Sequence, residues 1–219
     1  INSAAGIAYD SGSLGLTSLS PIGTEYAEAT DSLAVGDDDL AMRLMTGCRI
    51  STNTNVTGTS LATFICLFQV TDTATYGRDL AVGRTSSNTG NRRWRVRIGT
   101  NGHLAAELCD AAGAAIGTAT LAVPHNDGKP HIVMVQINAG PVVDLVTDLG
   151  AASSGVIGVF AGRGGWLLTG SATTDVRVLV DEWAYFDKNV AFPYDLSAVL
   201  DGTYVGLWDT DSLATRLTR

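Results

Sequence analysis

Short apolar or alternating runs, separated by turn residues, recur along almost the whole chain, and this rhythm is the strongest constraint on the fold. Alternation with a period of two is typical of strands that bury one face in a core. Asn101-Gly102 and Ala139-Gly140-Pro141 each lie between two such runs and predict tight hairpin turns. The runs span residues 33–35, 40–50, 61–70, 79–84, 92–98, 103–109, 117–123, 131–138, 142–147, 155–161 and 174–186.

This pattern predicts an all-β protein built as an antiparallel β-sandwich. Short strands at intervals of roughly ten residues, with turn signals between them, are typical of sandwiches. One short helix is predicted over residues 194–200, before Gly202. The chain has 219 residues and shows neither a clear boundary nor an internal repeat, so we expect a single domain over residues 1–219.

The chain is acidic, with 14 Lys and Arg against 22 Asp and Glu, a net charge of −8 and a pI near 4.7. A nucleic acid or an anionic membrane would need a basic face, so neither is expected as the main partner. The apolar runs are far shorter than the roughly 18 residues that cross a bilayer, so no membrane span is predicted.

Three cysteines, Cys48, Cys66 and Cys109, are widely spaced. No Cys-x-x-Cys motif or Cys/His cluster accompanies them, so the sequence does not predict a zinc site. Cys48 and Cys66 lie in apolar runs, which favours buried free thiols. A bridge between Cys48 and Cys66 on neighbouring strands is the alternative, and sequence alone does not decide between the two.

Alternation assigns the two faces of the run 92–98. Arg93, Arg95 and Arg97 point one way, and Trp94 is among the residues that point the other way, toward the expected core. The three arginines form a row with a spacing of about 7 Å. Such a row fits a carboxylate, a phosphate or an acidic partner. In a chain of net charge −8, pairing with acidic residues of neighbouring strands is the stronger alternative.

Three segments resemble parts of one family, in the order in which that family has them. The segments are 94–108, which holds Gly102-His103-Leu104; 126–145, which begins with Asn126-Asp127-Gly128; and 180–200, which holds Asp181-Glu182-Trp183. The first two resemble hairpins, and the third resembles the C-terminal end, of the laminin G-like, concanavalin A-like jelly-roll domains.

The resemblance covers residues 32–200 and implies a jelly roll, with residues 201–219 as a C-terminal extension. Pro130 stands where the family has Trp, and Ile132 stands where it has a second His. His131, in the same hairpin, is expected to be structural. These departures leave the expected fold unchanged, but they do not carry over a ligand site.

Several relatives with this jelly roll are glycoside hydrolases, which need two carboxyl groups roughly 5 to 10 Å apart. No predicted strand carries such a pair: Glu25 and Glu28 precede the sandwich pattern, and Asp181 and Glu182 are adjacent, so they point to opposite faces. A nucleophile motif of the Gly-x-Ser-x-Gly type does not occur. The chain is therefore predicted not to be an enzyme, and an Asp pair from different strands is the route left open to a glycoside hydrolase.

Calcium is the metal that the resemblance implies, because family members often bind Ca²⁺ on one rim. Calcium takes six to eight oxygen ligands from several loops. Two turns offer them: one holds Asp37, Asp38 and Asp39, and the other holds Asn126 and Asp127. A triple Asp is also an ordinary solvated turn.

A sugar site needs an exposed aromatic side chain with polar groups around it. Trp166, with Arg163 beside it in a Gly-rich loop, is the first candidate. Tyr76 and Arg78, in the loop before the run 79–84, are the second. The alternative for Trp166 is a side chain that folds back over the edge of the core.

These features predict a non-enzymatic recognition or adhesion module, outside the cell or on a virion surface, that binds a glycan or another surface polymer. Similar domains occur in bacterial surface proteins and in phage tail or capsid-decorating proteins, so the resemblance implies the same settings. The alternative is a purely structural virion subunit that contacts other virion proteins or forms a homo-oligomer. Its interface would use the arginine row Arg93, Arg95 and Arg97 together with Trp208.

Overall fold

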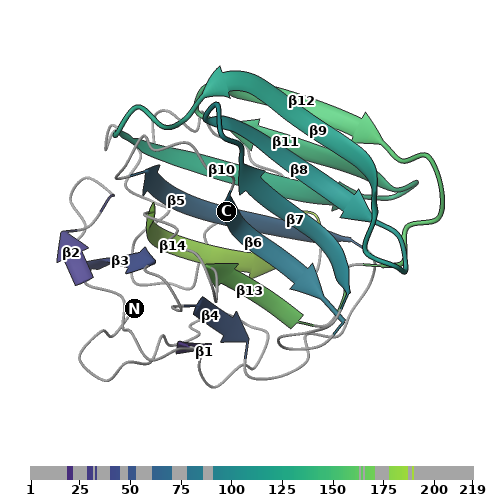
Figure 1. Ribbon diagram of the computed structural model, residues 1–219, viewed down its shortest axis with the longest axis horizontal. Coiled ribbons are helices and arrows are strands. Elements are labelled where there is room, and N and C mark those ends of the chain that lie inside the picture. The colour runs from purple at the N-terminus through teal and green to yellow at the C-terminus, as the bar shows by residue number, and fades with distance from the viewer. Residues whose placement is uncertain are drawn as a thin grey trace.

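The computed structural model is a sandwich of two antiparallel β-sheets, as the sequence predicts (Figure 1). The structure describes residues 19–21, 29–31, 33, 40–44, 49–52, 61–70, 78–85, 91–162, 164, 166–170, 178–186 and 189. The strands are β1 (Leu19–Pro21), β2 (Ala29–Asp31), β3 (Leu40–Leu44), β4 (Arg49–Thr52), β5 (Ala62–Val70), β6 (Arg78–Arg84), β7 (Arg92–Ile98), β8 (His103–Cys109), β9 (Ala115–Pro124), β10 (Pro130–Asn138), β11 (Val142–Thr147), β12 (Gly150–Gly155), β13 (Trp166–Gly170) and β14 (Val178–Phe186).

Each sheet has seven strands. The first has the order β1-β4-β13-β6-β7-β8-β9, and the second has the order β12-β11-β10-β5-β14-β3-β2. The chain crosses between the two sheets several times, so strands that are neighbours in a sheet come from distant parts of the sequence. The pair β5–β14 is an example, with Val178 opposite Val70.

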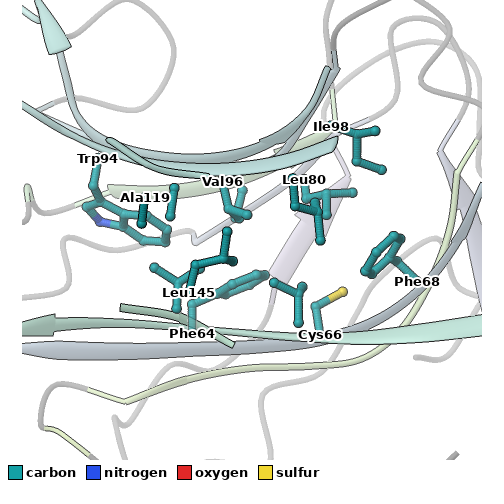
Figure 2. Close-up of a cluster of buried hydrophobic side chains, with 14 of the residues drawn as sticks. Phe64, Cys66, Phe68, Leu80, Trp94, Val96, Ile98, Ala119 and Leu145 are labelled. Carbon is teal, nitrogen blue, oxygen red and sulfur yellow. The ribbon is translucent and has the colours of Figure 1, made fainter. Parts of the chain in front are cut away.

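The core lies between the sheets and is filled by alternate residues of facing strands (Figure 2). In β5, Phe64, Cys66 and Phe68 point inward and are 0 to 1 % exposed. Trp94 enters from β7, and its ring centre lies 6.0 Å from that of Phe64. Interleaving of this kind is how two sheets exclude water from the roughly 10 Å between them.

The strand β7 has the two faces that the sequence predicts. Trp94, Val96 and Ile98 are buried in the core, whereas Arg93, Arg95 and Arg97 are partly exposed on the opposite face of the sheet. Both predicted hairpin turns are confirmed as well. Gly102, between β7 and β8, has a φ of 78°, and Gly140, between β10 and β11, has a φ of 83°. This left-handed backbone is the reason why glycine occupies the two turns.

Two predicted strands are wrong. The apolar run 40–50 is not one strand, because β3 belongs to the second sheet and β4 to the first. The run 155–161 is not a strand either; β12 precedes it and pairs with β11 across a short turn, Thr147 opposite Gly150. As the last strand of its sheet, β12 consists of small residues and needs no apolar pattern, so periodicity does not reveal it.

The thiols of Cys66 and Cys109 are free and buried, which confirms the prediction made for Cys66. The alternative bridge between Cys66 and Cys48 is therefore not formed. Cys48 itself, the predicted helix over residues 194–200 and the extension 201–219 lie outside the described residues. Within the described part of the chain, no helix is long and apolar enough to cross a membrane.

Candidate functional site

Charged side chains from three neighbouring strands meet on the outer face of the first sheet. The register places Asp79 of β6 opposite Arg97 of β7, and Arg95 of β7 opposite Glu107 of β8. Residues that pair across antiparallel strands point to the same face of the sheet. We call the group of Arg93, Arg95, Arg97, Asp79 and Glu107 the arginine face.

Glu107 is the centre of the arginine face. Its carboxylate accepts hydrogen bonds from Arg95 Nε at 2.7 Å and Arg95 Nη2 at 3.1 Å, and it also lies 3.0 Å from Arg97 Nε. The Glu107 side chain is 4 % exposed, whereas that of Arg97 is 41 % exposed. A buried carboxylate fixed by two guanidinium groups thus supports an arginine that reaches into solvent.

Arg95 also pairs with Asp79, the second acidic residue of the arginine face. Its Nη1 lies 3.5 Å from Asp79 Oδ1. Burial raises the pKa of Asp79, and the nearby positive charge of Arg95 opposes this rise. The stronger of the two alternatives for the arginine row, pairing with acids on neighbouring strands, is therefore confirmed for Arg95 and Arg97.

The same contacts show whether a carboxylate pair from different strands is available for a glycoside hydrolase. Asp79 and Glu107 are a carboxylate pair from different strands, but Arg95 lies between them. A general acid has to hold a proton and reach the substrate. The Glu107 side chain is only 4 % exposed and is paired with two arginines, so it is poorly placed to reach a substrate.

The surroundings of the arginine face are basic. Residues 78–109 contain six arginines but only two acidic residues, in a chain whose net charge is −8. Arg93 donates Nη1 to the backbone carbonyl of Asp110 at 3.1 Å, a contact that orients the guanidinium without neutralising its charge. The sequence shows these arginines, but only the pairing of β6, β7 and β8 brings them onto one sheet.

The Gly-rich segment before Trp166 lies beside this face. A Cβ placed on Gly164 would meet the backbone oxygen of Arg84 at 2.5 Å and Cγ of Arg93 at 3.0 Å, so glycine is needed for this close approach. Trp166 pairs with Arg84 in the next strand. The Gly-rich segment of the predicted sugar site and the arginine row are thus neighbours in space.

The structure describes the predicted sugar-binding residues only in part. Trp166 is the first residue of β13 rather than a loop residue, and its side chain lies outside the described residues, as do Arg163 and Tyr76. Arg78 is the first residue of β6 and is 5 % exposed, so it is not on an exposed loop as predicted. The extended pairing of β6 begins one residue earlier than the apolar run indicates. Trp208 lies outside the described residues.

Asn126 and Asp127 are engaged in contacts within the protein, and a calcium site at this turn stays a prediction. Asp127 Oδ1 lies 2.9 Å from His131 Nε2 and accepts a hydrogen bond from the Lys129 backbone at 3.0 Å. Asn126 packs against Gly102. The residues that the structure describes form no group of three or more His, Cys, Asp or Glu side chains that could hold a metal. Asp37, Asp38 and Asp39 lie outside these residues, and calcium at that turn stays a prediction.

Two buried histidines form a second polar cluster at the edge of the core. His131 lies 2.9 Å from Asp148 through Nδ1 and 2.9 Å from Asp127 through Nε2. Carboxylate oxygens only accept, so the protonated form of His131, with a hydrogen on each ring nitrogen, is the form that satisfies both contacts. Burial alone lowers the pKa of His131, but the hydrogen bonds to Asp148 and Asp127 outweigh it and raise the pKa above the usual value.

His125 is the opposite case. Its Nδ1 donates to the carbonyl of Val123 at 2.7 Å, and its Nε2 lies 3.1 Å from the hydroxyl of Thr147. Burial, and then the charge of His131 at a ring distance of 5.0 Å, lower the pKa of His125. These contacts support a structural role for His131, and the Asp127-x-x-x-His131 spacing is the signal that sequence reasoning could have used.

Comparisons with known proteins bear on the fold. No protein-family model and no curated protein matches the sequence. Among solved structures, the chain is similar to the receptor-binding domain of botulinum neurotoxin D, with a TM-score of 0.62, 12% identity, and coverage of 91% of this chain and 52% of that chain.

Two similar structures are complexes with a ligand. The binding domain of botulinum neurotoxin DC in complex with SialylT has a TM-score of 0.61 and 7% identity, over 91% of this chain and 51% of that chain. The serotype D ligand-binding domain in complex with N-acetylneuraminic acid has a TM-score of 0.59 and 12% identity, over 91% of this chain and 50% of that chain.

At these identities the similarity shows a shared fold. It supports a β-sandwich of the kind found in these receptor-binding domains, whereas the narrower assignment to the laminin G-like, concanavalin A-like domains stays a prediction. The chain spans about half the length of the structures that it matches.

Proposed function

We propose that this chain is a non-enzymatic recognition module that binds glycans at an extracellular or virion surface, with the arginine face as its binding site. The observation that carries the proposal is the placement of Arg97. Its guanidinium is fixed at Nε by the buried Glu107, and the side chain is 41 % exposed. A fixed arginine presents several hydrogen-bond donors in a set geometry, which lowers the entropy lost on binding.

Two further observations support this function. The fold is shared with receptor-binding domains, and two of the similar structures are complexes, one with SialylT and one with N-acetylneuraminic acid. The backbone of Gly164 borders the arginine face, two residues before Trp166, so the first sugar-binding segment predicted from the sequence lies next to the arginine row.

The test is a glycan array probed with the labelled full chain, with heat-unfolded chain as the control. We expect selective binding to a small group of glycans by the folded chain alone. If the folded chain binds no glycan, or binds the same spots as the unfolded chain, the proposed function is wrong.

A second candidate function is protein–protein contact in a larger assembly, and one observation favours it. Ile157 and Val159, in the segment that follows β12, are 92 % and 83 % exposed. Large apolar side chains that are exposed together mark interaction surfaces more often than isolated ones do. This segment would then contact another copy of the chain or a neighbouring virion protein.

Size-exclusion chromatography with light scattering, with and without EDTA, tests this second function. A defined oligomer that dissociates in the variant with Ile157→Ser and Val159→Ser would support it. A monomer in all conditions would argue against self-association. Loss of stability in EDTA would support the separate prediction of bound calcium.

A further inference from the structure

The charge of the arginine face differs from that of the rest of the molecule. Its strands and their connections, residues 78–109, carry six arginines and two acids, although the whole chain has a net charge of −8. The arginine face itself holds three arginines against two acidic residues, so it carries a net positive charge in an acidic chain and favours an anionic ligand. Such asymmetry steers a charged ligand to a single site.

The three arginines of β7 on this face have two roles. Arg95 supports the face, whereas Arg93 and Arg97 are available to a ligand. Arg95 contacts Glu107 through Nε and Nη2, and it contacts Asp79 through Nη1. Its side chain is only 16 % exposed. All three of its nitrogens are therefore engaged within the sheet, and its role is to hold the two acids in place.

Arg97 and Arg93 are differently placed. Arg97 contacts Glu107 through Nε, so the outer edge of its guanidinium, which carries the two Nη groups, is not part of that pair. Arg93 donates one Nη1 hydrogen bond to an uncharged carbonyl and keeps its positive charge. The planar guanidinium group binds a carboxylate or a sulfate through two parallel hydrogen bonds.

The spacing of these two arginines indicates the size of the ligand. Arg93 and Arg97 lie on the same face of β7, four residues apart, which corresponds to about 13 Å along a strand. A single small anion cannot reach both. An extended chain with more than one anionic group can do so, passing over Arg95 on the way.

From these observations we infer that the arginine face binds an anionic saccharide, with Arg97 and Arg93 each receiving a carboxylate or sulfate group of the sugar chain. This inference rests on the proposed function and specifies its ligand class. Glu107 fixes Arg97, the carbonyl of Asp110 orients Arg93, and the close approach of Gly164 to Arg93 marks one end of the site.

The experiment compares acidic and neutral sugars on the full chain by isothermal titration calorimetry. The probes are a hyaluronan oligosaccharide and sialyllactose, with lactose as the neutral partner, at low and at physiological salt. The variants are Arg97→Gln, Arg93→Gln and the double variant. Lys129→Gln removes the same charge from a side chain that is 77 % exposed on the connection between β9 and β10, and it is the matched control.

We expect the acidic sugars to bind more tightly than lactose, and their affinity to fall with added salt. For the hyaluronan oligosaccharide, which has more than one carboxylate, each arginine variant should lose roughly tenfold in affinity, since a hydrogen-bonded charge is removed. Lys129→Gln should bind like the unmodified chain. Circular dichroism of each variant confirms that the fold is kept.

Three outcomes would overturn the inference. If lactose and the acidic sugars bind equally, or if the arginine variants bind as well as Lys129→Gln does, the chain binds glycans at another site and only this inference fails. If single-stranded DNA binds as tightly as the acidic sugars and competes with them, the face is a general anion surface. If no sugar binds on the array or in solution, the proposed function itself fails.

Discussion

Arg95 donates two hydrogen bonds to Glu107, from Nε to Oε2 over 2.7 Å and from Nη2 to Oε1 over 3.1 Å. The two residues pair across β7 and β8, and Arg97, on the same face of β7, also contacts the Glu107 carboxylate. The bidentate geometry fixes both side chains. Because the carboxylate is buried while the arginines lie at the surface, this pair orders the outer face of the sheet.

Glu107→Gln should destabilise the protein by about 3 kcal/mol, because it removes one partner of a buried ion pair and leaves Arg95 without its carboxylate. The measurement is the free energy of unfolding from urea denaturation. Arg97→Gln is the matched comparison, since its side chain is 41 % exposed and its loss should cost less than about 1 kcal/mol. Equal losses in the two variants would show that the Glu107 pair is not the stabilising element of this face.

The stability contributed by His131 should depend on pH. The hydrogen bonds to Asp148 and Asp127 raise the pKa of His131, despite its burial, above the value of about 6.5 that it has in the unfolded chain. The folded state therefore favours the proton, and the stabilisation is fully present below the unfolded pKa and is lost as pH rises through the folded pKa. His131→Gln should thus cost most at mildly acidic pH, roughly 3 kcal/mol, and less at alkaline pH.

Urea denaturation of both proteins from about pH 5 to about pH 9 measures this difference. Asp148→Asn is the control, because it removes the partner of His131 Nδ1 and should weaken the same pH dependence. A cost of His131→Gln that stays constant over the range would mean that His131 is neutral in the folded protein.

Gly102→Ala should cost more than Gly140→Ala, although both glycines have a φ near +80°. Alanine in this left-handed conformation costs roughly 1 kcal/mol at either turn. At Gly102, the new Cβ would also meet Oδ1 of Asn126 at 2.1 Å, whereas nothing lies within 4 Å at Gly140. We therefore expect about 2 kcal/mol for Gly102→Ala, measured by thermal unfolding.

The contact with Asn126 can be tested directly. In an Asn126→Ala background, the extra cost of Gly102→Ala should disappear, so that the two glycine variants become equal. A Gly102→Ala penalty that persists without the Asn126 side chain would assign the whole effect to the backbone.

The thiols of Cys66 and Cys109 should resist alkylation in the folded protein. Cys66 is 0 % exposed and Cys109 is 1 % exposed, and burial raises the pKa of Cys109, so little reactive thiolate forms. Mass spectrometry after iodoacetamide treatment should find both residues unlabelled under native conditions and labelled in guanidinium chloride. Rapid native labelling of Cys66 would contradict the tight packing of the central strand β5.

The local features of the chain could be predicted because they depend on neighbours in sequence. Alternation placed Trp94 in the core and Arg95 on the outer face, and the turn residues located the hairpins at Gly102 and Gly140. The missed strand β12 has no such signal. Its small residues are ordered by backbone pairing to β11 at the end of a sheet, and this pairing leaves no trace in side-chain periodicity.

The candidate site depended on tertiary pairing to a greater extent. The sequence shows a row of arginines but does not show which acid meets it, because Glu107 is twelve residues from Arg95 along the chain. Likewise, the approach of Gly164 to Arg93 joins segments that are far apart in sequence. The ion pairs of Glu107 form only when β7 and β8 pair in the first sheet.

The sequence by itself therefore determined the class of fold, the inward and outward faces of β7, and the two hairpin turns, since these follow from backbone sterics and a period of two. Tertiary structure decided which strands are neighbours, which charges are paired, and that His131 lies between two carboxylates while His125 does not. The physical reason is that hydrogen-bond partners and burial are properties of residues brought together from distant parts of the chain, and no local pattern encodes them.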